Sequence, residues 1–149
     1  MNIPVNIQRL DASLPLPQYE TEGAVAFDFY AREDVVVQPK EIQLVPTNLI
    51  IEVPEGYGLV IAPRSSTPRK TGLTHPHSIG IIDQDYCGPK DEVKIQVYNF
   101  TAKPVTIKRG DRIGQGMIVP IMRAQWQETD FSHKQSRGGF GSTGESIDK

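Results

Sequence analysis

Apolar and polar residues alternate along several short stretches of the chain. The clearest is EVKIQVYN at 92–99, in which Val93, Ile95 and Val97 would face one side and the residues between them the other. A period of two is typical of a strand with one buried face. This stretch therefore predicts a half-buried β-strand.

Other runs, either alternating or rich in β-branched residues, are also predicted as strands: Val25–Ala31, Glu41–Val53, Tyr57–Pro63 and Pro104–Ile121. Turn signals separate the runs: Pro54–Gly56, Tyr86–Pro89, Thr101–Pro104 and Lys108–Asp111. No long stretch has the apolar spacing of a helix, and Ser66–His75 has room for a helical turn or two. Many short strands between turns predict an all-β fold, which is a sandwich, a jelly roll or a barrel.

The apolar pattern stops near Phe131, and the chain then becomes rich in glycine and serine. The segment Ser136–Ser146 reads SRGGFGSTGES, a composition that is typical of flexible chain ends. A length of 149 residues suits one domain. We therefore expect a β domain over residues 1–131 and a flexible tail over residues 132–149.

Composition excludes some classes of function. The formal net charge is −2 at pH 7, which argues against a general binder of nucleic acid or of acidic membranes. Cys87 is the single cysteine, so neither an internal disulfide nor a cysteine-rich metal site is expected, and a reducing compartment is favoured. No signal peptide or long apolar run is visible, and we expect a cytoplasmic protein.

Two stretches carry groups that suit a phosphate or a metal. Arg64 stands beside the hydroxyls of Ser65 and Ser66, and a guanidinium with hydroxyl donors suits a phosphate. The alternative is a surface turn with an N-cap serine. Asp28 interrupts an apolar strand, where it would either face solvent or be held rigidly as a carboxylate that faces a metal.

Asp83 and Asp85 lie between an apolar run and a glycine turn. A carboxylate there is a candidate general base or metal ligand, although Asp and Gly also simply form turns. The Arg-Gly-Asp triplet at 109–111 is discounted as a chance match. His75, His77 and His133 lack the spacing of a metal-ligand set, and we expect them at the surface or in loops.

Five stretches in order resemble the motifs of the trimeric dUTPase family: GAVAFDFYA, PRSS, GIIDQDYCG, RGDRIGQGMIVP and RGGFGSTG. The resemblance covers residues 23–144. It implies a β jelly roll and a homotrimer with three shared active sites. It also implies Mg²⁺-assisted hydrolysis of dUTP to dUMP and pyrophosphate, which limits uracil in DNA and supplies dUMP for thymidylate synthesis.

The resemblance also assigns roles near the reacting phosphates. Asp83 matches the carboxylate that activates the water attacking the α-phosphorus, and Asp28 matches the one that holds Mg²⁺, typically through metal-bound water. Arg64, Ser65 and Ser66 match the phosphate-facing turn, and Gln115 matches a polar residue on the phosphate side.

Selection of the nucleotide is implied in the same way. Tyr86 matches the aromatic under the deoxyribose, whose ring would leave no space for a 2′-hydroxyl. The segment 80–93 is expected to form a hairpin that reads uracil through its backbone, with Gly80 and Ile82 as contacts.

In the tail, the resemblance implies a segment that closes over a bound nucleotide. Phe140 would stack on uracil, and Arg137 would neutralise charge on the γ-phosphate. Gly141, Ser142 and nearby backbone amides would cradle that phosphate.

Some positions depart from the family pattern. Val25, Ala26 and Phe29 replace the usual residues of the first motif, and an insertion lengthens the hairpin at Pro89–Glu92. The alternatives are a dCTP deaminase or bifunctional deaminase–dUTPase on the same fold, an RGG-type module that binds nucleic acid, and a regulatory binding protein with the dUTPase fold.

Overall fold

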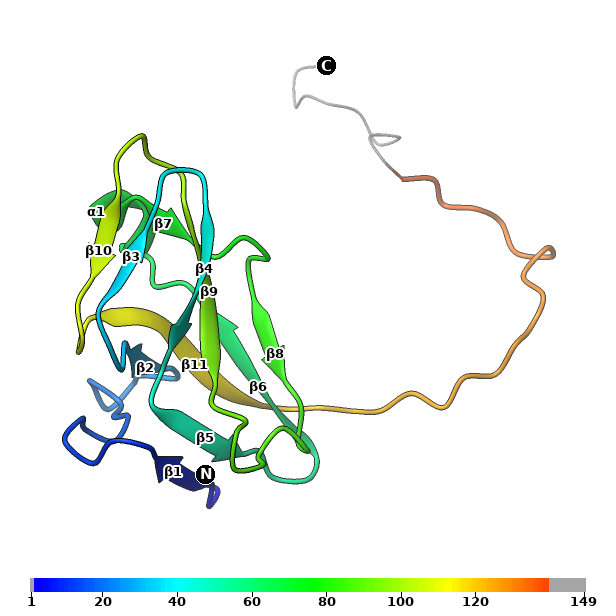
Figure 1. Ribbon diagram of the computed structural model, residues 1–149. Coiled ribbons are helices and arrows are strands. Elements are labelled where there is room, and N and C mark those ends of the chain that lie inside the picture. Colours follow the sequence, from blue (N-terminus) through cyan, green and yellow to red (C-terminus); the bar gives the residue numbers. More distant parts are fainter. Residues whose placement is uncertain (1, 140–149) are drawn as a thin grey trace.

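Short strands follow one another along most of the chain (Figure 1). The computed structural model describes residues 2–139. Its elements are β1 (Asn6–Arg9), β2 (Phe27–Tyr30), β3 (Val35–Val37), β4 (Ile42–Pro46), β5 (Leu49–Glu52), β6 (Tyr57–Ala62), α1 (Thr67–Thr71), β7 (Leu73–Thr74), β8 (Gly80–Ile82), β9 (Lys94–Asn99), β10 (Val105–Ile107) and β11 (Arg112–Pro120). The predicted all-β class is confirmed, and α1 falls in the segment that left room for a helical turn.

The strands pair in four antiparallel sheets, with the orders β2-β11-β6-β8, β4-β9-β7, β1-β5 and β10-β3. One buried cluster joins the two larger sheets: Phe29 of β2, Leu59 of β6 and Val97 of β9 all belong to it and are at most 1% exposed. Partners such as β2 and β11 lie far apart in the sequence, as in a jelly roll.

The period of two along β9 has the predicted effect. Val93, Ile95 and Val97 are buried in the core cluster. The residues that alternate with them are exposed or half-buried. The hydrophobic pattern therefore fixes which face of β9 packs inward.

The apolar run at 41–53 is two strands and not one. Thr47 and Asn48 separate β4, which pairs with β9, from β5, which pairs with β1. Asn48 adopts a left-handed backbone with φ of 75°. Its side-chain amide donates to the Asp11 carbonyl at 2.9 Å and accepts from the Asp11 backbone N–H at 2.6 Å. These bonds hold the bend at which the chain changes sheets.

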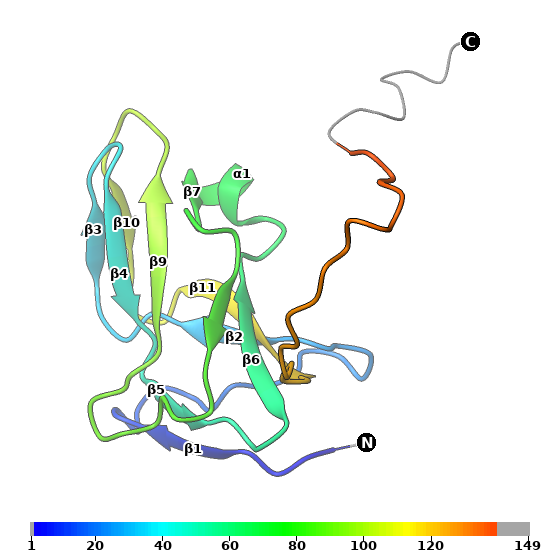
Figure 2. The same cartoon turned by 90° about the vertical axis from the view of Figure 1, so that its right-hand side faces the viewer.

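The turn that precedes α1 begins directly after the end of β6 at Ala62. Figure 2 shows α1 beside β7 at one end of the molecule. The helix stops at Gly72, whose φ of 74° suits a residue without a side chain. The short helix thus returns the chain to the sheet and leaves the segment 63–66 as an open turn.

After β11 ends at Pro120, residues 121–139 contain no helix or strand and run away from the sheets (Figure 1). Met122, Trp126 and Phe131 in this segment are largely exposed. Among residues 2–139, no helix has the length and apolar character needed to cross a membrane.

Candidate active site

Three strands of the largest sheet bring predicted site residues into one row. On β11, Gln115 pairs with Asp28 of β2 on one side and with Ala62 of β6 on the other. The Gln115 side chain donates to the Pro63 carbonyl at 3.1 Å. The first, second and fourth motifs of the sequence therefore meet at this point of the sheet.

Asp28 lies opposite the core but is not open to solvent. Its neighbours Phe27 and Phe29 are buried in the core, so the alternation of the strand turns Asp28 to the outer face. Arg64 Nε lies 2.8 Å from Asp28 Oδ1, and Arg112 Nη1 lies 3.0 Å from Oδ2. These two guanidinium groups leave Asp28 only 7% exposed. The interpretation that it faces solvent is therefore wrong, and it is rigidly held.

A β-bulge in β11 turns Arg112 toward Asp28. Gly114 pairs with Phe29, so regular pairing would place Arg112 opposite Ala31, which is fully buried. The bulge between Arg112 and Gly114 instead places Arg112 opposite Tyr30, on the Asp28 side of the strand. The guanidinium lies 5.9 Å from the centre of the Tyr30 ring. One extra residue thus brings a second cation to the carboxylate.

The turn after β6 keeps its hydroxyl groups available. Ser66 is the N-cap residue of α1, but its side chain makes no capping hydrogen bond. Ser65 is exposed. A neighbouring hollow of about 390 Å³ is lined by both Arg64 and Arg112. The residues suited to an anion therefore lie together around this turn.

Asp83 follows β8 at the opposite end of β6. Gly80 pairs with Ile61 and Ile82 pairs with Leu59, so Asp83 lies beside Gly58. Asp83 is exposed, as is Asp85, and both line a hollow of about 540 Å³. The same hollow is lined by Arg123, which the sequence motifs did not point to.

Side chains of the loop after Asp83 hold it by hydrogen bonds to β6 and within the loop. Gln84 donates to the Tyr57 carbonyl at 2.9 Å. Tyr86 donates its hydroxyl to the Glu92 carbonyl at 3.2 Å. The inserted residues make a tight turn, in which the Gly88 N–H donates to the Asp91 carboxylate at 2.7 Å.

The prediction of a hairpin over residues 80–93 is wrong, because the strands on either side of the loop are not hydrogen-bonded to each other. β8 pairs with β6, whereas β9 pairs with β4 and β7. The two strands that flank the loop therefore belong to different sheets. Prolines, glycines and aspartates favour turns but do not show which neighbour each flanking strand will take.

The two groups of candidate residues are separated within one chain. Asp83 lies beside Gly58 near the start of β6, and Arg64 follows its end at Ala62. Four residue steps at about 3.3 Å each make the strand about 13 Å long between Gly58 and Ala62. A single chain therefore does not bring Asp83 to Arg64 and Asp28.

Arg137 is exposed, and the hydrogen bonds of the segment around it are local. The predicted tail contacts Phe140, Gly141 and Ser142 lie outside the described residues.

The metal role of Asp28 stays a prediction, and its surroundings leave room for an indirect contact through water. Residues 2–139 contain no group of three His, Cys, Asp or Glu side chains that could hold a metal ion. Each oxygen of Asp28 faces one guanidinium, but an ionised carboxylate has about four acceptor positions. Asp28 can therefore still accept hydrogen bonds from water on a hydrated cation.

The histidines were expected at the surface or in loops. His77 and His133 are exposed, and His75 lies in the loop after β7 but is only 3% exposed. Its Nε2 lies 3.1 Å from the Ile113 carbonyl, and its Nδ1 is buried without a partner among the described residues. Burial lowers the pKa of His75 against the opposing effect of the Ile113 hydrogen bond. It is therefore a neutral histidine that packs against β11.

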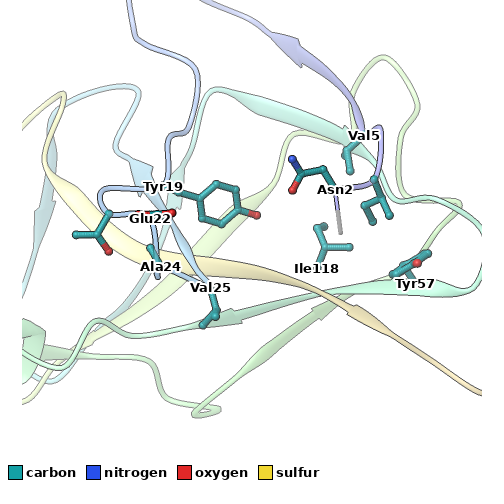
Figure 3. A pocket seen from close by; sticks show the side chains of 10 residues that line it. Asn2, Val5, Tyr19, Glu22, Ala24, Val25, Tyr57 and Ile118 are labelled. Atoms are coloured by element: carbon teal, nitrogen blue, oxygen red, sulfur yellow. The ribbon is translucent and has the colours of Figure 1, made fainter.

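Another hollow, of about 830 Å³, lies elsewhere (Figure 3). Tyr19, Tyr57 and Ile118 line it, and none of its lining residues is a lysine or an arginine. A triphosphate carries several negative charges and requires cations or many N–H donors. This hollow therefore does not suit a nucleotide.

Known proteins that are similar to this chain support its resemblance to the dUTPase family. The dUTPase family model matches residues 12–144. The deoxyuridine 5′-triphosphate nucleotidohydrolase of Hydrogenobaculum sp. (strain Y04AAS1) is 44% identical over 147 residues, which cover 97% of this chain and 99% of the relative. These matches do not favour the deaminase or the non-enzymatic alternatives.

Solved structures agree as well. The dUTPase of Streptococcus mutans is 30% identical, with a TM-score of 0.74 over 80% of this chain and 98% of that chain. The dUTPase of Staphylococcus bacteriophage 80alpha with dUPNHPP shares the fold, with a TM-score of 0.84 and 23% identity over 96% of this chain and 99% of that chain. The predicted jelly-roll class is confirmed by these neighbours. The chain therefore belongs to the dUTPase family and is a hydrolase that acts on dUTP.

Proposed function

We propose that this dUTPase cleaves dUTP to dUMP and pyrophosphate in a site shared between copies of the chain. The observation that carries the proposal is the buried Asp28, held between Arg64 and Arg112 beside Gln115, in a chain whose family acts on dUTP. Arg112 also lies 2.9 Å from Glu20 Oε1, so two guanidinium groups balance two carboxylates here. The N–H groups of Arg64 that do not contact Asp28 would suit the oxygens of a triphosphate.

The phosphates would lie along the turn after β6. Arg64 contacts Asp28 through Nε at 2.8 Å, and its Nη groups would donate to phosphate oxygens. Ser65 and the uncapped hydroxyl of Ser66 would donate to phosphate oxygens. Gln115 is fixed by its bond to Pro63 and would approach the same phosphates.

Asp83 would take the proton from the attacking water. The water oxygen forms a bond to the α-phosphorus, and the bond from that phosphorus to the oxygen bridging to the β-phosphate breaks. Pyrophosphate leaves with the bonding electrons, and the proton passes to the carboxylate. Asp83 is exposed beside a hollow, as such a base requires before substrate is bound.

Mg²⁺ is proposed to enter with the triphosphate. Bound there, it would neutralise phosphate charge and orient the chain of phosphates. Asp28 would accept hydrogen bonds from its water ligands, with the carboxylate held in place by Arg64 and Arg112.

The nucleoside would lie at the loop that follows β8. Tyr86 would lie under the deoxyribose, where its ring leaves no space for a 2′-hydroxyl. Gly80 and Ile82 would present backbone groups to uracil. Because about 13 Å of β6 lies between Gly58 and Ala62, we infer that the Asp83 loop of one copy meets the Arg64 turn of another.

We infer that the assembly is a homotrimer, as the family resemblance implies. Arg137, with Phe140, Gly141 and Ser142 beyond it, would close over the nucleotide. Closure would exclude water other than the nucleophile. The proposed place of action is the cytoplasm, with no membrane or nucleic-acid partner.

The test is pyrophosphate release from dUTP, dCTP, dTTP and UTP in parallel, with and without Mg²⁺. Ammonia is measured in the dCTP reaction. We expect release from dUTP alone, and much less of it after chelation of Mg²⁺. Ammonia from dCTP would contradict the proposal in favour of a deaminase. Equal release from UTP would contradict the role of Tyr86.

A further inference from the structure

The loop that carries Tyr86 ends at a buried carboxylate. Glu92 is only 6% exposed. Its Oε1 accepts from Arg32 Nε at 2.8 Å and from the Asn48 backbone N–H at 2.8 Å, and its Oε2 accepts from Arg32 Nη2 at 3.1 Å. The hydrogen bond to Glu92 raises the pKa of Arg32 above its ordinary value. A two-pronged contact of this kind fixes orientation as well as distance.

The backbone next to Glu92 is equally constrained. The Val93 N–H donates to the Leu49 carbonyl at 2.8 Å. The Val93 carbonyl accepts from the Thr47 backbone N–H at 3.1 Å and from the Thr47 hydroxyl at 2.6 Å. Val93 is fully buried. The peptide that follows Glu92 is therefore fixed to the bend between β4 and β5.

The carbonyl of Glu92 is the acceptor for Tyr86. The Tyr86 hydroxyl donates to it at 3.2 Å, and the residue is 39% exposed. An exposed ring on a loop has few packing contacts to restrict it, so this bond at the far end of the side chain limits where the ring can swing. The anchor lies on the rigid part of the loop and not on its tip.

We infer that the Arg32–Glu92 pair is a positioning device for the Tyr86 ring, and that it sharpens the choice of deoxyribonucleotides over ribonucleotides. The inference rests on the proposed role of Tyr86 under the sugar. Exclusion of a 2′-hydroxyl by contact works only if the ring cannot retreat. A shift of the Glu92 carbonyl would release the ring and admit UTP.

A purely structural role for the pair predicts a different result. Loss of the pair would then lower the stability of the protein, or the activity on both nucleotides by the same factor. The deciding readout is therefore the ratio of kcat/KM for dUTP to kcat/KM for UTP. Thermal unfolding of each variant separates effects on stability from effects on this ratio.

The experiment compares Tyr86→Phe, Glu92→Gln and the control Glu33→Gln with the wild type. Glu33 is the exposed acid 3.8 Å from the same arginine, so its substitution removes the same charge without touching the Arg32–Glu92 contact. We expect Tyr86→Phe to lower the ratio by about threefold to tenfold, the equivalent of one neutral hydrogen bond. Glu92→Gln should lower it at least as much, and Glu33→Gln should leave it unchanged.

Unchanged ratios in Tyr86→Phe and Glu92→Gln would overturn the inference. So would an equal loss of activity on both nucleotides. If Glu92→Gln does not fold, Arg32→Lys keeps the charge but loses the two-pronged contact and is expected to lower the ratio as well. A wild-type enzyme that does not prefer dUTP to UTP would instead refute the sugar filter itself, and this inference with it.

Discussion

Asp28 shows how a charged residue is accommodated in a mainly apolar strand. Phe27 and Phe29 pack inward on either side of it, and the carboxylate is covered by Arg64 and Arg112 on the outer face. A buried ion is tolerated when it is paired and otherwise costs several kcal/mol, on the order of 3–5 kcal/mol when one partner is removed. The ion pairs therefore belong to the fold as much as to the site.

His75 gives a residue with a distinct pH signature. Its ring is buried, and its Nδ1 has no acceptor among the described residues for a second proton. His77 faces it at 6.4 Å between ring centres, and a charge there also disfavours protonation of His75. The folded pKa thus lies below the ordinary value of about 6.5.

We predict that His75 lowers the stability of the protein in mild acid. Below about pH 6.5 this histidine binds a proton in the unfolded chain but stays neutral in the folded chain, because its folded pKa is lower. Acidification therefore favours unfolding until the pH falls below the folded pKa. Urea unfolding between pH 7.5 and 5.5 measures the effect. His75→Phe should show a weaker dependence on pH than the wild type.

The matched control is His77→Phe, because His77 is exposed. It should retain most of the pH dependence of the wild type. If the wild type and His75→Phe unfold with the same dependence on pH, His75 is not the titrating group. The sequence could not have given this prediction, because nothing in THPHS distinguishes the buried histidine from the exposed one.

Strand β11 is the element on which the site depends most. It pairs with β2 and β6, and its bulge puts Ile113 in the core while Arg112 faces Asp28. The sequence predicts the strand and the fourth motif. It does not predict the bulge, because one extra residue in a ladder depends on a partner strand that lies about eighty positions earlier in the chain.

Gly116 gives a prediction for the packing of this strand. A Cβ at this position would lie 2.7 Å from Phe29 Cε2 and 2.8 Å from Phe27 Cζ. Both rings are buried, so neither can move aside without disturbing the core. Gly116→Ala should lower the free energy of unfolding by about 1–3 kcal/mol.

Urea unfolding at fixed protein concentration is the measurement. Gly23→Ala is the control, since no atom lies within 4 Å of a Cβ built there. It should change stability by less than about 0.5 kcal/mol. Equal stability of the two variants would show that the phenylalanine rings adapt to the added methyl group.

The local pattern of apolar and polar residues predicts some features of the other elements and misses others. The alternation along β9 predicted its buried face, because one row of side chains decides it. The bend at Thr47–Asn48 was missed, since the apolar run continues through it and only the contact of Asn48 with Asp11 marks the change of sheet. Strand pairing is a property of segments distant in sequence, and no periodicity encodes it.

At the scale of the whole molecule, the separation of Asp83 from Arg64 predicts complementation between inactive chains. Asp83→Asn removes the proposed base and should lower turnover at least about a hundredfold, while binding of dUPNHPP persists. Arg64→Ala removes a phosphate contact and should also be nearly inactive. Neither variant alters the other half of the site.

Co-expression of these two variants should restore activity. In the proposed arrangement, a complete site needs an intact Arg64 from one copy and an intact Asp83 from another, so random mixing would make about a quarter of the sites complete. Pyrophosphate release from the purified mixture measures this fraction. Mixed assemblies that are as inactive as the separate variants would place both residues of a site in the same chain.

The length of β6 has a further consequence for dilution. In the proposed arrangement, a folded chain that leaves its partners keeps its core and its sheets but holds only unmatched halves of a site. Any closed assembly has one complete site per chain, whereas an open one leaves a spare half at each end. Dilution would then abolish activity before the chains unfold. Specific activity would be proportional to the fraction of chains in closed assemblies and not to the fraction that is folded.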